Sequence, residues 1–411
     1  MPAKSQPPVL CSPVVQRQGA ACYRGLIMSD VRLKSAEEFE RHFGCKPEYL
    51  SYAPGRVNLI GEHTDYNDGF VLPCAIKYGT AITARKNGTD KMRLLAVDIN
   101  HDTDEFVCSA TFNAHESKTW SNYLRAMTSL IMEKGHKVEG LDIAISGDIP
   151  LGSGLSSSAS LEVTFGNLLS QVFGLNIPLQ QIALTGQACE ALNGCKCGIM
   201  DQTIVACGRA DSALLIDCRS LELKQISVPE NLDILIVNSN VKHALVGGEY
   251  NERREQCENA ARILGVKALR DATMEMLDAH KADMDDVTYR RARHVITEDD
   301  RVLEAVKAFE QGDLASLATL MYASHCSMRD DFEITIPEID GLVEIIREAI
   351  GENAAVRMTG GGFGGSVVAV VDPAKVDQVK AAIDAKYEAL AGRKATIIET
   401  HAFDGATFTA L

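Results

Sequence analysis

A short run rich in glycine and serine is the strongest candidate for chemistry in this sequence. It reads Pro150-Leu-Gly-Ser-Gly-Leu-Ser-Ser-Ser-Ala-Ser160. Gly152 and Gly154 carry no Cβ, so the backbone can bend there and a ligand can approach closely. A helix that begins among the serines would offer N–H groups without intrahelical partners, at the positive end of its dipole. This arrangement is typical of an anion site, and phosphate is its usual ligand.

A predicted strand precedes the run and a predicted helix follows it. Residues 141–146 alternate in hydropathy, and apolar residues after the run recur on one helical face. The run differs from the Walker phosphate loop because it lacks the Gly-Lys-Ser/Thr ending. It differs from the dinucleotide fingerprint because Ser157 replaces the third glycine. A plain helix cap with spare serines is the alternative, and the run alone leaves both interpretations open.

A second stretch, residues 54–69, is dense in side chains that can bind hydroxyl groups or phosphate. These are Arg56, Asn58, Glu62, His63, Asp65, Tyr66 and Asn67. Carboxylates and an imidazole in a fixed array can hold several hydroxyls at once. We expect a loop that Leu59 and Ile60 anchor in a core. A solvated surface loop, or a metal site of His63 and two carboxylates, are the alternatives.

Two carboxylates and a glycine run complete the set of candidates. Glu190 lies near the end of a predicted helix at 179–192 and, taken alone, would be an exposed helix charge. Asp201 lies between apolar residues, as a buried cap or a catalytic group would. The run Gly360–Gly365 matches G-x-G-x-x-G, but a strand follows it and not a helix. We therefore expect a turn that presses against a ligand or against the other domain.

Composition restricts the class of protein. The chain has 411 residues, of which 46% are hydrophobic and 24% charged, which predicts a soluble globular protein with two domains. Its net charge of −15 argues against nucleic acid and anionic membranes as partners. No run approaches the ~18 apolar residues of a membrane span. We expect an anionic ligand to be met by a local site.

Cysteine usage indicates a reducing compartment. The twelve cysteines are mostly scattered singly through apolar segments, which is typical of reduced thiols in the cytoplasm. Cys195-Lys-Cys197 is a close pair, with Cys189 nearby. A zinc site would usually show Cys-x-x-Cys and a second pair, so zinc is disfavoured here.

The remaining elements follow from periodicity and turn signals. Residues 1–27 predict a disordered tail, or an upstream start with Met28 opening the protein. The first helix is expected to be capped by Ser35. Strands are expected at 49–53, 70–85, 91–99, 105–109, 141–146, 213–217, 232–237, 354–359, 366–371 and 395–401, the last closing the chain. Helices are expected at 120–134, after 160, at 179–192 and 249–264, through most of 270–350, and at 373–390.

Three runs now support a resemblance to a known family. Pro54–Tyr66, Pro150–Ser160 and Thr359–Gly365 stand in the order found in the GHMP small-molecule kinases. Within the first, Gly55–Tyr66 resembles the galactokinases. Three further runs look like those of bacterial galactokinases: Asp217-Cys-Arg-Ser, Glu249-Tyr-Asn-Glu-Arg-Arg-Glu-Gln-Cys257 and Met328-Arg-Asp-Asp-Phe-Glu-Ile334. The resemblance covers the chain from about residue 30 to its end.

The resemblance implies an α+β fold of two domains behind the tail of residues 1–27. Residues 28–225 would form a kinase N-terminal domain, of the ribosomal protein S5 domain 2-like type, which binds galactose and ATP. Residues 226–411 would form a ferredoxin-like α+β domain. The implied reaction transfers the γ-phosphoryl group of ATP to the C1 hydroxyl of D-galactose, giving galactose 1-phosphate and ADP. The resemblance implies that this reaction is the first committed step of galactose catabolism. We expect a cytoplasmic enzyme that is a monomer, with an oligomer as the open alternative.

The resemblance also implies a role for each candidate residue. Asp201 would be the general base, with Arg56 beside it. The ATP phosphates would lie against Gly152, Ser153, Gly154, Leu155, Ser156, Ser157 and Ser158. Ser158 and Glu190 would hold Mg²⁺, which favours oxygen ligands. The sugar would be held by Glu62, His63, Thr64, Asp65, Gly198 and Tyr250.

The sequence departs from the family in two places, at residues 192–194 and in the extension at residues 1–27, which matches nothing in the family pattern. Leu192-Asn193-Gly194 stands where the family has Val-Gly, and the segment is one residue shorter. Two alternative functions share the family's motifs. An N-acetylgalactosamine kinase would need extra space beside the sugar C2. A catalytically silent galactose sensor would lack residues after the serine pair, whereas Ser156–Ser160 is complete. Homoserine and mevalonate kinases lack the run Glu62–Asp65.

Overall fold

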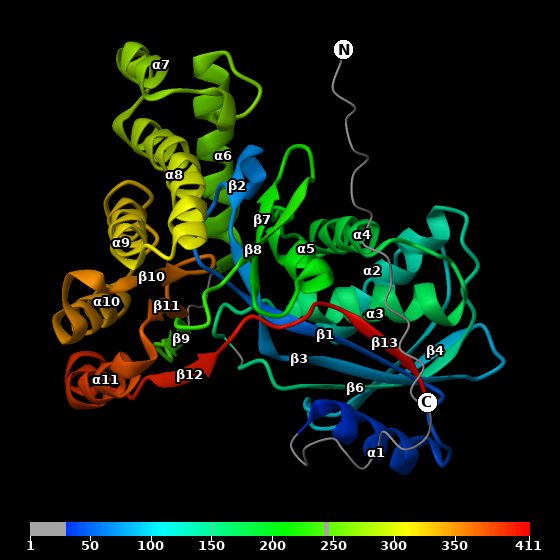
Figure 1. Ribbon diagram of the computed structural model, residues 1–411. Coiled ribbons are helices and arrows are strands. Elements are labelled where there is room, and N and C mark those ends of the chain that lie inside the picture. The colour runs from blue at the N-terminus through cyan, green and yellow to red at the C-terminus, as the bar shows by residue number, and fades with distance from the viewer. Residues whose placement is uncertain (1–29, 151, 242–245) are drawn as a thin grey trace, which may run out of the picture.

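A six-stranded sheet forms the base of the N-terminal lobe (Figure 1). We describe residues 30–150, 152–241 and 246–411 of a computed structural model. The strand order is β13-β1-β3-β6-β4-β5, and β4 pairs with β6 in parallel while the other neighbours are antiparallel. The strands are β1 (Tyr49–Asn58), β3 (Pro73–Lys86), β4 (Lys91–Ala96), β5 (Asp102–Val107), β6 (Leu141–Gly147) and β13 (Thr407–Ala410).

Helices cover both faces of this sheet because its strands alternate apolar side chains between the faces. In β6, Ile143 and Ile145 belong to one apolar cluster, and Ala144 belongs to another with Phe39. In the described part of the chain, α1 (Val31–Phe43) is the helix that covers the Ala144 face (Figure 1). The other face carries α2 (Thr119–Glu133), α3 (Ser157–Val172), α4 (Leu179–Leu192) and α5 (Met200–Cys207).

A second sheet has four antiparallel strands in the order β10-β11-β9-β12. They are β9 (Asp233–Asn238), β10 (Ala355–Thr359), β11 (Ser366–Val371) and β12 (Thr396–Thr400). This strand order, with helices after β9 and after β11, confirms the ferredoxin-like prediction. The helices of this lobe are α6 (Val246–Leu264), α7 (Met274–Ala279), α8 (Asp286–Gln311), α9 (Leu314–Asp330), α10 (Pro337–Ile350) and α11 (Val376–Ala391), with 3₁₀ turns η3 (Leu269–Asp271), η4 (Lys281–Asp283), η5 (Gly351–Asn353) and η6 (Pro373–Lys375).

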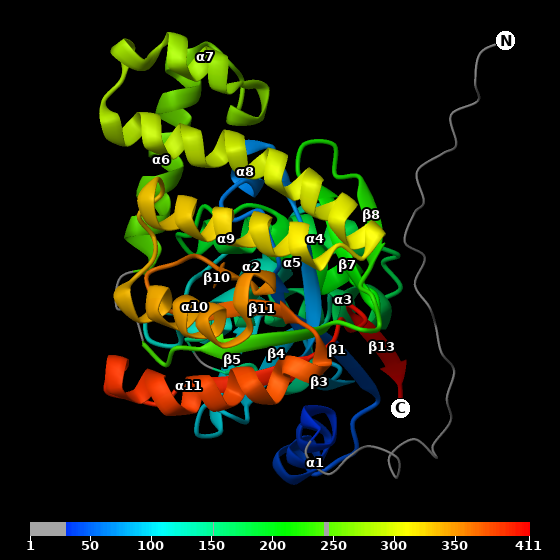
Figure 2. The same cartoon turned by 60° about the vertical axis from the view of Figure 1, so that its left-hand side comes forward.

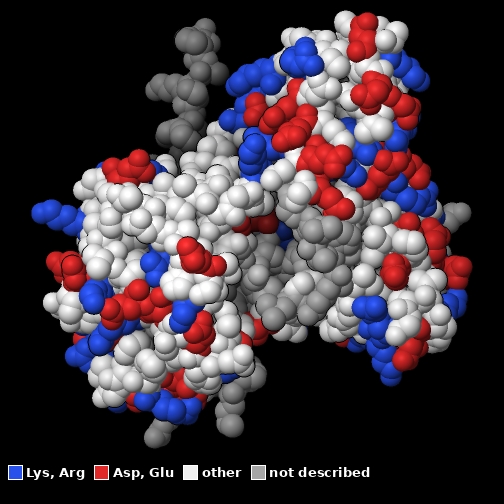
Figure 3. Space-filling model, turned by 180° about the vertical axis from the view of Figure 1, so that it is seen from behind, with Lys and Arg blue, Asp and Glu red and all other residues white. Residues whose placement is uncertain are grey.

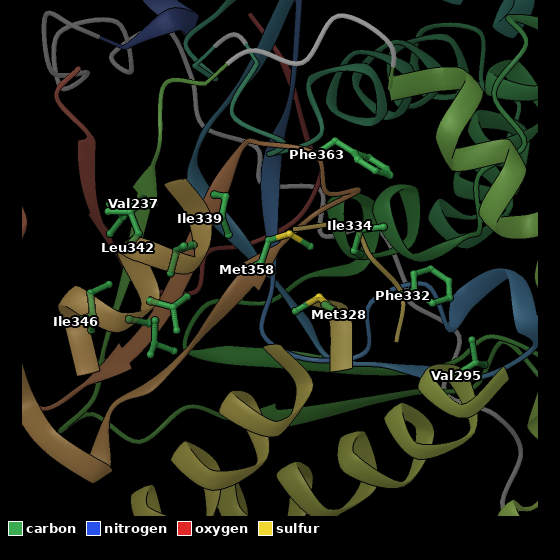
Figure 4. Packing of buried hydrophobic residues seen from close by; sticks show 14 of the residues in the cluster. Val237, Val295, Met328, Phe332, Ile334, Ile339, Leu342, Ile346, Met358 and Phe363 are labelled. Atoms are coloured by element: carbon green, nitrogen blue, oxygen red, sulfur yellow. The ribbon is translucent and has the colours of Figure 1, made fainter. Parts of the chain in front are cut away.

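The two lobes share part of their core. In β9, Leu235 and Val237 pack into a cluster with residues of α10 and α11. Figure 4 shows Val237 together with Leu342 and Ile346 of α10, and Figure 2 shows the two helices beside the strands of this lobe. Ile234 and Ile236 point the other way, into a cluster that also contains Val57 of β1 and residues of α8 and α9. Because one apolar cluster includes both sheets, the space between the lobes is set by packing.

A three-stranded sheet lies beside the junction of the lobes. It consists of β2 (Phe70–Val71), β7 (Ser212–Asp217) and β8 (Leu223–Ser227), in that order. Residue 225, the predicted domain boundary, falls within β8. In addition, β13 brings the end of the chain back to β1. A division into 28–225 and 226–411 stays a prediction.

Three local predictions were wrong. The helix α1 begins at Val31 and is capped by Asp30. Ser35 is not the cap, because its hydroxyl is buried and donates to the carbonyl of Ala144 at 2.8 Å. The strand β1 continues through an irregularity between Pro54 and Arg56 to its end at Asn58, so Arg56 lies on a strand and not in a loop. The strand β13 was not predicted. The interpretation of residues 1–27 lies outside the described residues.

Among the described residues, no helix is both long enough and apolar enough to cross a membrane.

Candidate active site

A cavity of about 330 Å³ lies between the lobes, and we call it the interlobe cavity. Figure 3 shows the hollow from behind, with acidic and basic groups at its bottom. Nine predicted site residues line the cavity: Arg56, Glu62, His63, Asp65, Ser158, Glu190, Gly198, Asp201 and Tyr250. Tyr123, Cys195, Cys197, Met200, Gln202, Gly360 and Gly361 complete the lining.

A two-bond ion pair joins Arg56 to Asp201 in this cavity. The distances are 2.6 Å from Nε to Oδ1 and 2.7 Å from Nη2 to Oδ2. Arg56 is 5% exposed, and its Nη1 also donates to the carbonyl of Gly154 at 2.6 Å. Burial opposes the charge of Arg56, but Asp201 outweighs it and the pKa of Arg56 lies above its usual value. The guanidinium therefore fixes the plane of the Asp201 carboxylate and ties it to the glycine–serine loop.

The glycine–serine loop ends at the first turn of α3, as predicted. Ser156 has φ +61° at the helix N-cap, and its hydroxyl donates to Asp201. Gly55 lets β1 approach the loop, since a Cβ there would lie 2.7 Å from the carbonyl oxygen of Leu155. Leu155 itself is buried in the core, and the Ser153 hydroxyl bonds to Pro150. The loop can therefore offer backbone N–H groups and the α3 N-terminus to an anion, but not the side chains of Leu155 or Ser153.

The glycine run of the C-terminal lobe packs against this loop. Gly360 has φ +89°, and a Cβ on it would lie 3.1 Å from the carbonyl oxygen of Gly154. The Ser366 hydroxyl donates to the carbonyl of Ser153 at 2.7 Å. The prediction of a turn that presses against the other domain is therefore confirmed.

Glu62 is held by the C-terminal lobe and faces the cavity. Its Oε1 accepts from the backbone N–H of Gly360 at 2.7 Å and lies 3.3 Å from the guanidinium of Arg357. Burial raises the pKa of Glu62, against the opposing effect of Arg357. Sequence reasoning missed Arg357, although a charged residue in the middle of an apolar strand signals a buried ion pair.

His63 offers one ring nitrogen to a ligand. Its Nδ1 lies 2.8 Å from the hydroxyl of Tyr66, whereas its buried Nε2 has no hydrogen-bond partner among the described residues. The ring packs between Tyr250 and Phe332, at centroid distances of 5.1 Å and 4.9 Å. Burial lowers the pKa of His63 to about 3, so the imidazole is neutral at pH 7. A neutral Nε2 can exchange a hydrogen bond with a sugar hydroxyl.

Asp65 and Gly198 fit against each other on the same side of the cavity. A Cβ on Gly198 would lie 1.9 Å from Oδ2 of Asp65, so only glycine fits there. Burial and the charge of Asp201 raise the pKa of Asp65 to about 7. Thr64 is different: it is fully buried, its hydroxyl bonds to the carbonyls of Gly61 and Phe70, and it does not line the cavity.

Ser158 and Glu190 form an oxygen pair at the other end of the cavity. Their side chains share a hydrogen bond, and Glu190 is 8% exposed. Burial raises the pKa of Glu190, and no described Lys or Arg lies within ion-pair distance of it. Next to it, Glu162 is 1% exposed, and its Oε1 has no hydrogen-bond partner among the residues that the structure describes. Burial and the charge of Glu190 raise the pKa of Glu162 well above its usual value. Hard oxygen donors that lack a counter-charge fit a small divalent cation such as Mg²⁺.

Sequence reasoning missed Glu162, and it treated the segment 192–194 as a departure from the family. Glu162 lies four residues after Ser158, so helical spacing could have placed it on the same side of α3. The short segment is accommodated at the end of α4, where Asn193 is the C-cap and Gly194 has φ +93°. Glu190 still reaches the cavity.

Comparison with known proteins agrees with this geometry. Residues 37–86 match the galactokinase galactose-binding signature, 122–209 the GHMP kinase N-terminal domain, and 305–389 the GHMP kinase C-terminal domain. The chain is similar to Lactococcus lactis galactokinase, whose crystal structure was solved in complex with galactose. The identity is 34%, the TM-score is 0.87, and the match covers 92% of this chain and 98% of that one.

More distant structures share the fold alone. Methanococcus jannaschii mevalonate kinase is 19% identical with a TM-score of 0.63, over 87% of this chain and 99% of its own. L. major mevalonate kinase is 16% identical with a TM-score of 0.60, over 86% of this chain and 95% of its own. The signature and the closely similar galactokinase structure go beyond the shared fold, and the chain therefore belongs to the galactokinase family of GHMP kinases.

Proposed function

We propose that this protein transfers the γ-phosphoryl group of ATP to the C1 hydroxyl of D-galactose, giving galactose 1-phosphate and ADP. The observation that carries the proposal is the composition of one cavity. Hydroxyl-binding groups (Glu62, His63 and Asp65) lie beside the Arg56–Asp201 pair, and that pair contacts the glycine–serine loop. No observation favours an N-acetylgalactosamine kinase or a silent sensor.

The proposed chemistry depends mainly on positioning and charge, since phosphoryl transfer passes through a loose transition state. Asp201 would accept the proton of the C1 hydroxyl, from a carboxylate whose plane Arg56 holds in place. Arg56 would also stabilise negative charge on the transferring group. The loop at the start of α3 would bind the ATP phosphates through its N–H groups.

The sugar and metal assignments complete the proposal. Glu62, His63 and Asp65 would bind sugar hydroxyls. Tyr250 would form one wall of the sugar pocket, and Gly198 would leave room for the side chain of Asp65. Ser158 and Glu190 would hold Mg²⁺, which on binding neutralises charge on the ATP phosphates. We place Thr64 among the residues that shape the loop rather than those that touch the sugar. We further propose a cytoplasmic monomer.

The direct test is ADP release with Mg-ATP in a coupled assay. Galactose, glucose, N-acetylgalactosamine and no sugar are compared under the same conditions. Turnover with galactose alone supports the proposal, including recognition of the axial C4 hydroxyl. Turnover with N-acetylgalactosamine that equals or exceeds that with galactose contradicts the assigned substrate. Absence of turnover, with galactose still raising the melting temperature, contradicts the assignment of catalysis.

A further inference from the structure

The segment that connects α4 to α5, residues 193–199, carries two cysteines and lies between two cavities. We call it the cysteine loop. Cys195 and Cys197 line the interlobe cavity on one side. The same two residues line a second cavity of about 290 Å³ on the other side, between α4 and Arg254 of α6. Both side chains are half-buried, so small molecules can reach them from either cavity.

The two thiols open onto the same two cavities and are separated in the sequence only by the exposed Lys196. The pKa of Cys195 is lowered and that of Cys197 is raised, in each case chiefly by the other thiol. A disulfide requires Cβ atoms that lie ~3.8 Å apart, so a bond between Cys195 and Cys197 would hold this short loop in a contracted form.

The cysteine loop is also fastened to the C-terminal lobe. Arg254 Nη1 donates to the carbonyl of Lys196 at 2.8 Å. The side chain of Asn251 accepts from the Lys196 N–H and donates to the carbonyl of Gly194, both at 3.3 Å. These residues share α6 with Tyr250, so a shift of the loop is transmitted to one side of the sugar pocket.

Contacts with Asp65 restrict the position of the C-terminal end of the cysteine loop. Gly198 packs so closely on Asp65 that a Cβ would overlap its carboxylate, and the N–H of Met200 bonds to the same group at 3.4 Å. A contraction of the loop at 195–197 therefore displaces Gly198, Asp65 or both.

We propose that Cys195 and Cys197 are a redox-sensitive pair that a peroxide converts into a disulfide, and that this disulfide impairs sugar phosphorylation. In the first step one thiol attacks the peroxide, giving a sulfenic acid and water (an alcohol for an organic peroxide). In the second step the other thiol displaces water from the sulfenic acid and forms the S–S bond. Overall, two thiols are oxidised and one peroxide is reduced. Two equivalents of a small thiol reverse the reaction by exchange.

The first test maps the bond without reference to activity. The reduced full-length protein is treated with hydrogen peroxide, free thiols are alkylated, and peptides are analysed by mass spectrometry. We expect a Cys195–Cys197 disulfide that dithiothreitol removes. Phenylarsine oxide gives an independent readout, because it bridges two adjacent thiols with loss of water. We expect one phenylarsenic group across this pair. Free thiols at both positions after peroxide, or bonds to other cysteines only, would overturn the proposal.

The second test measures the effect on turnover, and this half rests on the proposed function. Cys195→Ser and Cys197→Ser are compared with the parent, each normalised to its own reduced activity. Cys326→Ser is the matched control, since Cys326 is also half-buried but lies on α9. We expect a reversible loss of roughly tenfold in kcat/KM for galactose in the parent and the control, because ångström-scale misplacement of binding groups costs up to ~10²-fold.

The outcomes separate the two ideas. Either serine variant should keep its reduced activity after peroxide, and equal inactivation of these variants and the parent would overturn the regulatory role. A mapped disulfide without loss of turnover would overturn it as well. If the reduced parent does not phosphorylate galactose, the proposed function fails, whereas peptide mapping still decides whether the thiol pair exists.

Discussion

At the scale of single residues, Asp201 is held by three contacts that decide how it can be tested. Two come from Arg56 and one from the hydroxyl of Ser156. Asparagine keeps one oxygen for Arg56 and nearly the same shape, so the fold should survive its introduction. The substitution removes the negative charge and the capacity to accept a proton, and it places an amide NH2 group against one of the donors that now bond to Asp201.

We therefore expect Asp201→Asn to lower kcat by roughly 10²–10⁴-fold, the usual contribution of a positioned acid or base. The melting temperature should also fall, because the buried guanidinium of Arg56 loses the negative charge of its partner. The KM for ATP should stay within a few-fold of the parent value. Steady-state ADP release and a thermal melt measure both quantities. A variant with near-normal kcat would remove Asp201 as the base.

Glu190 can also be tested by a single substitution. Its carboxylate forms no ion pair with a Lys or Arg among the described residues. Glu190→Gln keeps the size and the hydrogen bond to Ser158 but removes the charge that would attract a divalent cation. We expect the Mg²⁺ concentration for half-maximal rate to rise by roughly tenfold or more at saturating ATP. Glu304→Gln, at an exposed carboxylate on α8, is the control. An unchanged Mg²⁺ titration would move the metal site away from Glu190.

At the scale of elements, α8 supports the sugar-binding loop from below. The buried Glu298 of α8 accepts from the N–H groups of Gly61 at 3.0 Å and Glu62 at 3.4 Å. Arg301 donates to its other oxygen at 2.7 Å. Burial is the largest single effect and would raise the pKa of Glu298, but Arg301, His294, Arg357 and the hydrogen bond from Ser324 together outweigh it and the pKa falls to about 2. Glu298 is thus a charged positioning residue that does not line the cavity.

Glu298→Gln should weaken galactose binding without removing catalysis. The neutral amide holds the two N–H groups less firmly and leaves Arg301 without its partner, which costs about 3–5 kcal/mol of unfolding free energy. We expect the KM for galactose to rise roughly tenfold, with kcat at saturating sugar kept within a few-fold. Steady-state kinetics and urea unfolding measure these effects. Glu304→Gln, two turns further along α8 in a surface pair, should change stability by ~0–1 kcal/mol. A loss confined to kcat would contradict the positioning role.

The turn between β10 and β11 can be tested with a matched pair of glycines. Gly360 and Gly392 both have a left-handed backbone, with φ +89° and +65°. A Cβ on Gly360 would lie 3.1 Å from the carbonyl oxygen of Gly154 in the glycine–serine loop, whereas a Cβ on Gly392 would have no atom within 4 Å. Alanine at either position costs roughly 1–2 kcal/mol for the left-handed backbone. We expect Gly360→Ala alone to raise the KM for ATP several-fold, because its methyl group displaces the Gly154 carbonyl. Equal kinetics of the two variants would show that the contact does not shape the ATP site.

At the scale of the molecule, the sequence predicted contiguous features better than distant ones. The strand, loop and helix around the glycine–serine run, the helix at 179–192 and the order of strands and helices in the C-terminal lobe follow from local pattern, and the structure confirms them. The ferredoxin-like strand order was implied by the family resemblance, and the structure confirms it as well. Ser35 was wrongly taken as a cap because an isolated serine near a helix start has the same local signal whether it faces solvent or a sheet. The roles of Arg357, Glu298 and β13 depend on partners far along the chain, which periodicity cannot identify.

The contact between the two halves of the sequence should also make stability depend on pH. Asp299 of α8 accepts from the N–H of Phe70 at 2.8 Å, and its buried Oδ2 has no partner in the described residues. Burial raises the pKa of Asp299 from 3.8 to about 7. Between these values the folded protein holds a proton at this site that the unfolded chain has released. The unfolding free energy contributed by this group therefore falls as pH rises from about 4 to about 7, and then levels off.

Asp299→Asn should remove this decline, since asparagine can still accept from Phe70 but carries no titrating proton. We expect the variant and the parent to be similarly stable near pH 4.5, and the variant to be more stable at pH 8 by roughly 1–4 kcal/mol. Urea unfolding at the two pH values measures the difference, and Glu304→Gln should show the parent's pH dependence. Equal stability of Asp299→Asn and the parent at pH 8 would mean that Asp299 ionises in the folded protein without cost. The junction of the two lobes would then not limit stability at high pH.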